Sequence, residues 1–148
     1  MERDGRGPLR KVLIVMLVLT VGFVLGALST QGLHAQYQPI TRAVLVKSEK
    51  LTGIPSMDGY VMDVTIAPGA QSGWHLHPGH EFSYVQDGEG TLEVQGQPPM
   101  RLKKGVGFHV DAMVPHNGIN ASKTAPLHVA VIYVVESGKP LATPVARP

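Results

Sequence analysis

The chain has 148 residues, with 17 glycines, 12 prolines and no cysteine. This length supports one domain with a packed core, and the lack of cysteine excludes a disulfide framework and thiolate metal sites. Four of the 13 basic and two of the 11 acidic residues precede residue 36, which leaves nine of each after it. Because that remainder is formally neutral and has no basic stripe, we expect no nucleic-acid binding.

The first 35 residues have the composition of an export signal. Four basic residues lie among the first eleven, and an uncharged apolar run of 17 residues follows from residue 12 to residue 28. A basic start, an apolar stretch and an exit of small residues are typical of a signal peptide. Cleavage after Ala35 would release a soluble protein that starts at Gln36. Without cleavage, the run would be a helical membrane anchor with its basic end in the cytoplasm. In both cases we expect an exported domain, in the periplasm or another extracytoplasmic space.

Residues 36–148 predict a single all-β domain, with its core over about residues 40–136. Short β-branched and alternating runs between Gly and Pro turns predict about eight strands, and therefore a sandwich or small barrel. The clearest of these runs are 41–48, 59–67, 81–86, 90–95, 105–110 and 127–135.

Several local features of this domain carry separate predictions. Asp87 to Glu89 predicts a hairpin, and Gly96 to Pro99 predicts another turn. The almost continuous apolar run 127–135 is expected to be buried on both faces. The tail from residue 137 to residue 148, rich in proline, is expected to be poorly ordered.

A cluster of metal-ligand side chains stands out near the middle of the chain. His75 and His77 are two residues apart, so a strand would place both rings on one face. Glu81 follows Pro78-Gly79, which we expect to reverse the chain and return the carboxylate beside the histidines. His116, at the start of a later strand, is the best candidate for a fourth ligand. Three imidazoles and one carboxylate suit a divalent transition metal, namely Fe, Mn, Ni, Cu, Co or Zn. The alternative is that these are surface or core histidines with structural roles.

At this point the spacing resembles the two motifs of the cupin superfamily. The first motif is matched at every fixed position, and the second is matched at three positions. The matching residues are Gly69, His75, His77, Glu81 and Gly88 in the first motif, and Gly105, His116 and Asn120 in the second. Asp111 and Met113 stand where the second motif has Pro and Gly, in the loop before His116.

The resemblance implies a double-stranded β-helix, the cupin jelly roll, with a metal inside the barrel. It also implies that His75, His77, Glu81 and His116 are the metal ligands. A quercetinase-like cupin of this kind would be a metal-dependent dioxygenase of a small aromatic or enediol substrate, with Glu81 as ligand and base. The alternative is a non-catalytic cupin that binds metal and a small ligand, or senses it. Small cupins commonly pair as homodimers, so we expect one here.

Strand parity predicts what surrounds the site. If Glu81 faces the barrel interior, Ser83 faces it too, whereas Phe82 and Tyr84 face outward. His80, His109 and His128 are expected to be packing or surface histidines, and Asn120 is expected to hold its loop through backbone hydrogen bonds. Few basic residues lie near the ligands in sequence, so we expect a pocket poor in charge that disfavours strongly anionic substrates.

Overall fold

The computed structural model describes residues 39–148. The predicted signal or anchor segment lies outside these residues. Within them the protein has ten strands and no helix, so none that could cross a membrane. The strands are β1 (Ile40–Ser48), β2 (Met57–Ile66), β3 (His75–Leu76), β4 (Gly79–Asp87), β5 (Glu89–Val94), β6 (Met100–Lys103), β7 (Gly107–Val110), β8 (His116–Ile119), β9 (Leu127–Glu136) and β10 (Thr143–Pro144).

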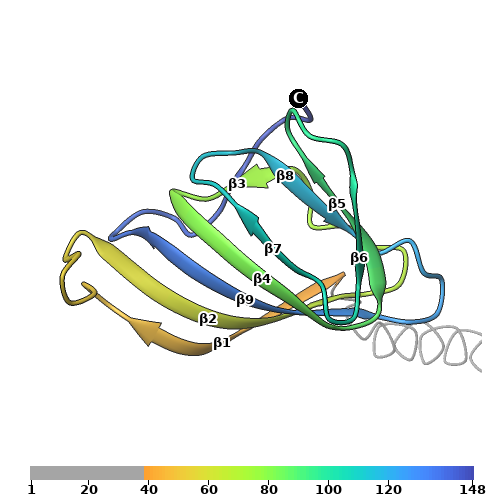
Figure 1. The fold of residues 1–148 in the computed structure, drawn as a ribbon, viewed down its shortest axis with the longest axis horizontal. Coiled ribbons are helices and arrows are strands. Elements are labelled where there is room, and N and C mark those ends of the chain that lie inside the picture. Colours follow the sequence, from red (N-terminus) through yellow and green to blue (C-terminus); the bar gives the residue numbers. More distant parts are fainter. Residues whose placement is uncertain (1–38) are drawn as a thin grey trace, which may run out of the picture. The chain divides into compact units, whose positions relative to one another are not determined.

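The strands form two antiparallel sheets that face each other around a common interior (Figure 1). The first sheet has the order β1-β2-β9-β4-β7, and the second sheet has the order β10-β3-β8-β5-β6. Strands that are consecutive in the chain often belong to different sheets, as β3 and β4 do. The two antiparallel sheets are those of a jelly roll, so the predicted all-β class and architecture are confirmed.

The core lies between the inner faces of the two sheets. Buried aliphatic side chains of β2 and β9 meet those of β5 and β6, among them Val64, Val131, Leu92 and Leu102. Each such side chain removed from water contributes about 1.5–3 kcal/mol of hydrophobic stabilisation. The alternation predicted for the strand around residues 59–67 places its apolar members in this core.

Two predictions about the outer parts of the fold are wrong. β9 is buried on one face only, because no layer of the described residues 39–148 covers the outside of the first sheet, and Ile132 there is 47% exposed. The tail is also paired: β10 forms a ladder with β3, and the amide of Val145 donates to the carbonyl of Trp74. These contacts attach residues 143–145 to the second sheet beside the histidine cluster.

Of the two predicted turns, one forms a hairpin, and the other is a corner at which the chain passes from one sheet to the other. Gly96 to Pro99 joins β5 to β6, which pair with each other. By contrast, β4 and β5 on either side of Gly88 belong to different sheets, so the predicted hairpin is wrong. Gly88 has a φ of 87°, and a Cβ there would lie 2.4 Å from the carbonyl oxygen of Pro126. Only glycine allows the chain to pass so close to the start of β9.

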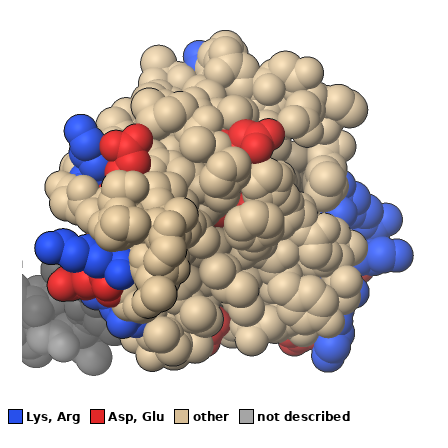
Figure 2. Space-filling view, turned by 60° about the vertical axis from the view of Figure 1, so that its left-hand side comes forward, with Lys and Arg blue, Asp and Glu red and all other residues tan. Residues whose placement is uncertain are grey.

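Charged side chains are interspersed on the face of the molecule shown in Figure 2. Blue and red groups lie side by side near its left-hand margin, blue groups predominate at its right-hand margin, and the middle of that face carries few charges. A surface with mixed signs is expected when acidic and basic residues are equal in number.

Candidate metal centre

The four predicted ligands come together in the interior, contributed by both sheets. His75 lies on β3 directly opposite His116 on β8, and His77 follows β3 by one residue. Glu81 is the third residue of β4 and reaches them from the first sheet. The segment Pro78-Gly79 therefore carries the chain from one sheet to the other, and it returns the carboxylate of Glu81 beside the histidines as predicted. One ligand atom from each of the four residues lies within 4.8 Å of all the others.

Each of the three imidazoles is held by a main-chain carbonyl. The Nδ1 atoms of His75, His77 and His116 lie 2.7, 2.5 and 2.9 Å from the carbonyl oxygens of Gly73, Leu141 and Val114. A carbonyl only accepts, so each Nδ1 must carry the proton and donate it. In a neutral ring this leaves the lone pair on Nε2. Metal-bound histidines are usually oriented in this way by a hydrogen bond from the other ring nitrogen.

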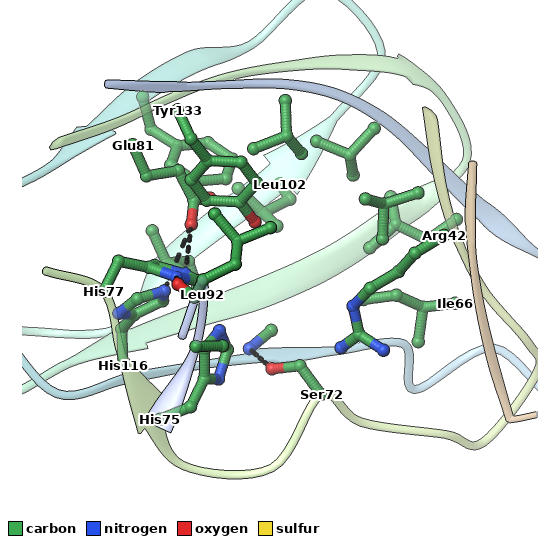
Figure 3. A pocket seen from close by; sticks show the side chains of 18 residues that line it. Arg42, Ile66, Ser72, His75, His77, Glu81, Leu92, Leu102, His116 and Tyr133 are labelled. Atoms are coloured by element: carbon green, nitrogen blue, oxygen red, sulfur yellow. Dashed lines mark hydrogen bonds and ion pairs between the residues drawn. The ribbon is translucent and has the colours of Figure 1, made fainter. Parts of the chain in front are cut away.

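The free ring nitrogens of His77 and His116 point at the carboxylate of Glu81 (Figure 3). Nε2 of His77 lies 3.1 Å, and Nε2 of His116 lies 3.3 Å, from the same oxygen, Oε2 of Glu81. If His116 carries a second proton, its Nε2 can donate a hydrogen bond to this oxygen. Nε2 of His77 has no hydrogen-bond partner among the described residues, although it is fully buried. A buried polar atom without a partner is costly, and a cation placed between these atoms would satisfy all of them. The donor set therefore fits a divalent metal ion.

Burial and mutual contact shift the pKa values of these groups in opposite directions. Burial disfavours ionisation of Glu81, but its contacts with His116, His77 and Ser83 outweigh the effect of burial and hold the pKa of Glu81 far below its usual range. Burial also acts against a charged His116, yet its contact with Glu81 raises the His116 pKa. For His75, burial dominates and lowers the pKa to about 4. Glu81 is thus an anion at neutral pH, and His75 is a neutral imidazole.

Two further side chains contact residues of this cluster. Ser83 Oγ donates to its other oxygen, Oε1, at 2.7 Å, as expected from strand parity. The Tyr133 ring, on β9, packs 4.6 Å from the ring of His77. Burial, with a smaller effect of the Glu81 charge, raises the pKa of the Tyr133 phenol well above its usual range, so it stays a proton donor. No sequence motif marks Tyr133, although its alternation with Val129 and Val131 places it on the inner face of β9.

A cavity of about 100 Å³ opens from the ligand cluster into the barrel. Its remaining walls are mainly aliphatic and aromatic, including Val64, Leu92 and Phe108. The cavity is poor in charge, as predicted, since Glu81 is its one acidic and Arg42 its one Lys or Arg lining residue. Arg42 could not be found by looking for basic residues near the predicted ligands in sequence, because it comes from β1.

The other histidines lie outside the cluster, as predicted. Nδ1 of His80 lies 3.0 Å from Nε2 of His109, and the His109 ring stacks on Phe82 on the outer face of the first sheet. His128 is 3.0 Å from the hydroxyl of Thr65. None of the three histidines lines the cavity.

Two residues of the second motif region have clear structural roles: Asn120, which matches the motif, and Met113, which departs from it. The Asn120 side chain donates to the carbonyls of Ile66 and Ala125, which confirms its predicted function in holding the loop. Met113 has a φ of 62°, a conformation that glycine adopts more easily, and its amide donates to the carbonyl of His77 at 2.9 Å. The loop thus adopts a left-handed conformation at Met113 without a glycine and contacts the main chain of His77.

Comparison with known proteins agrees with this architecture and this site. The family model for the cupin domain matches residues 62–133, which include all four clustered residues. The protein belongs to the cupin superfamily. A comparison with curated protein sequences gives no match.

Solved structures with the same fold come from several bacteria. A cupin-like protein of Thermotoga maritima is 25% identical over 72% of this chain and 76% of its own, with a TM-score of 0.56. The polyketide cyclase RemF of Streptomyces resistomycificus is 17% identical, over 75% and 74%, with a TM-score of 0.57. The DMSP lyase DddQ of Ruegeria pomeroyi is 24% identical, over 77% of this chain and 57% of its own, with a TM-score of 0.56. At these identities the last two show the fold alone.

Proposed function

We propose that the protein binds one divalent transition-metal ion through His75, His77, Glu81 and His116 and uses it to act on a small organic ligand in the cavity. The observation that carries this proposal is the buried Nε2 of His77, which has no hydrogen-bond partner in the described part of the chain and faces a carboxylate. Iron, manganese, nickel, copper, cobalt and zinc all accept such a mixed nitrogen and oxygen donor set.

The reaction that this site suits best is dioxygenation of a small aromatic or enediol compound. A bound transition metal would supply Lewis acidity and redox chemistry at the end of the cavity. The chain itself would supply three functions. Apolar walls exclude water, Tyr133 keeps a hydrogen-bond donor beside Glu81, and the Glu81 carboxylate can take the proton of a substrate hydroxyl. Ser83 holds that carboxylate in place through Oε1.

Metal content tests the ligand assignment directly. We expect about one equivalent of metal in the wild-type protein purified from its native compartment, and a loss of at least about tenfold in affinity in His77→Ala. His128→Gln is the matched control, because this histidine lies outside the cavity and should leave the metal content unchanged. An unchanged metal content in His77→Ala, with both variants folded, would refute the assignment.

Oxygen consumption separates the enzyme from a binding protein. Flavonols and catechols would be added anaerobically to protein loaded with each metal, followed by oxygen. We expect oxygen uptake that depends on the substrate and disappears in Glu81→Gln, because the base is lost. A ligand that binds tightly and is recovered unchanged, with no uptake for any metal, would instead favour the alternative of a metal-dependent binding or sensor protein.

We also propose that the domain acts outside the cytoplasm. The support is the basic and apolar composition of the first 35 residues, which is typical of a signal peptide or membrane anchor. Fractionation of cells that produce the full chain should place it in the periplasm or at the membrane. Deletion of residues 12–28 should leave the protein in the cytoplasm, and an unchanged distribution would contradict export.

A homodimer is the assembly that we propose for the domain. Its support is the uncovered outer face of the first sheet, where Phe82 and Tyr84 on β4 and Ile132 on β9 are about half exposed. Phe82 and Ile132 are directly opposite each other in the ladder, so these side chains form one apolar surface. Contiguous exposed apolar surfaces of this kind mark protein interaction sites.

A further inference from the structure

The backbone register directs Arg42 into the barrel. Arg42 on β1 lies directly opposite Val64 on β2, and residues paired in this way point to the same side of a sheet. Val64 is buried in the core and lines the cavity. Arg42 lines the cavity too, but its side chain also stays exposed to solvent, so it lies at the open side of the cavity. Figure 3 shows the guanidinium group of Arg42 directed into the cavity, toward the side on which Ser72 and His75 lie.

The charge of Arg42 is not compensated within the protein. No ion pair or side-chain hydrogen bond joins it to any residue of the described range 39–148. Glu81, the one acidic residue among the cavity-lining residues, is already engaged by His77, His116 and Ser83. The positive charge of Arg42 nevertheless acts on the interior. It lowers the pKa of Tyr133, against the larger rise that burial causes.

We propose that Arg42 binds the carboxylate of a small substrate whose opposite end carries the oxygen donors for the metal. This inference rests on the proposed function and narrows its substrate to aromatic or enediol acids. A metal dication with the Glu81 anion leaves one net positive charge, and Arg42 adds a second at the other side of the cavity. An apolar cavity with a positive charge at each of two sides favours a ligand that has a negative group at one end and an ionisable hydroxyl at the other.

The anion is a carboxylate rather than a phosphate because the cavity offers a single strong cation. A planar guanidinium binds a carboxylate through two parallel hydrogen bonds. Phosphate sites usually add main-chain amides or further cations, and Arg42 is the one Lys or Arg side chain that lines the cavity. The cavity volume of about 100 Å³ also restricts the ligand to a compact molecule.

A pair of probes of nearly equal shape tests this inference. The full chain, in non-ionic detergent and loaded with Co²⁺, would be titrated anaerobically with 3,4-dihydroxybenzoate and with 3,4-dihydroxybenzamide. Both probes offer the same catechol to the metal, but only the first has a carboxylate. We expect the wild type to bind the benzoate at least about tenfold more tightly than the benzamide, because one charge-assisted hydrogen-bonded pair is worth that much.

Arg42→Gln should remove this preference. In that variant we expect the affinity for the benzoate to fall about tenfold, the affinity for the benzamide to change less than about threefold, and the Co²⁺ content to stay the same. Arg101→Gln is the matched control, since it removes the same charge from an exposed pair with Glu89 and should leave the preference intact. Equal affinities of the wild type for the two probes, or no binding of the benzoate, would overturn the inference while the metal site stands. A wild-type protein that takes up no Co²⁺ would overturn the proposed function itself and the inference with it.

Discussion

At the scale of single residues, the site depends on where the histidine protons are. Main-chain carbonyls hold a proton on Nδ1 of each ring, so metal binding requires Nε2 to be free of a proton. His75 meets this condition already at neutral pH, because burial lowers its pKa to about 4. His116 does not meet it fully, because its contact with Glu81 overcomes the effect of burial and raises its pKa. The metal must therefore displace a proton from His116.

This proton competition predicts how metal affinity depends on pH. A raised His116 pKa means that the metal-free site holds the extra proton below that pKa and loses it above. We expect affinity to rise about tenfold per pH unit up to the His116 pKa and then to level off. Below about pH 4 the slope should steepen, because His75 is then protonated too.

Calorimetry in buffers of different ionisation enthalpy, with a competing chelator, would measure the protons released. Glu81→Gln should shift the plateau to lower pH, since the cause of the raised His116 pKa is removed. An affinity that does not change between pH 5 and pH 7 would contradict the proton assignment at His116.

At the scale of strands, β4 shows how far the sequence predicts the site. Strand parity places Glu81 and Ser83 on the inner face and Phe82 and Tyr84 on the outer face, and all four positions are confirmed by their burial. Parity is local, because it follows from the geometry of one strand. The histidine spacing was informative for the same reason.

Features that depend on pairing between distant strands could not be predicted in this way. Arg42 enters the cavity only because β1 pairs with β2 in the register that sets it opposite Val64. The carbonyl of Leu141 orients His77 across 64 residues of chain, and a main-chain group leaves no signature in side-chain chemistry. The residues around Gly88 predict a hairpin, whereas the chain there crosses to the other sheet. The same turn residues occur in both kinds of connection, so the sequence does not distinguish them.

Gly79, where the chain enters β4 between two ligands, gives a prediction at this scale. A Cβ there would lie 2.1 Å from the carbonyl oxygen of Val134 and 2.5 Å from Cα of Val135, both in the backbone of β9. Because β9 is held on both sides by other strands, it cannot move away. We expect Gly79→Ala to lower the free energy of unfolding by about 3 kcal/mol. The melting temperature should then fall by more than about 10 °C.

Gly107→Ala is the matched control, because Gly107 lies in β7 of the same sheet, where the nearest contact of a Cβ is 3.6 Å. Its stability should stay within about 0.5 kcal/mol of the wild type, or rise, since alanine restricts the unfolded chain. Equal melting temperatures for the two variants would show that the approach of β4 to β9 is not tight in solution.

At the scale of the whole molecule, the two faces of the first sheet have different tasks. The inner face completes the cavity, whereas the outer face leaves Phe82, Tyr84 and Ile132 in contact with solvent. The strand β1 is moreover an edge with only one partner, and it exposes Val44, Leu45 and Val46. Unprotected edges and apolar faces favour association. Pairing two copies through the outer face of this sheet would cover the apolar side chains and leave the cavity, on the inner face, unobstructed.

This arrangement predicts that one substitution on the outer face separates the copies without affecting the site. Ile132→Lys places a charge in the middle of the proposed interface, where burying an isoleucine side chain would otherwise contribute about 1.5–3 kcal/mol per copy. For the domain that starts at Gln36, we expect the dimer dissociation constant to rise at least about tenfold in sedimentation or light-scattering measurements. Met100→Lys, on the edge strand of the other sheet, changes an equally exposed apolar residue and should leave the dimer intact. Metal content should be the same in both variants, because Ile132 does not line the cavity. A wild-type domain that is monomeric at all concentrations would show that the outer face serves another partner or none.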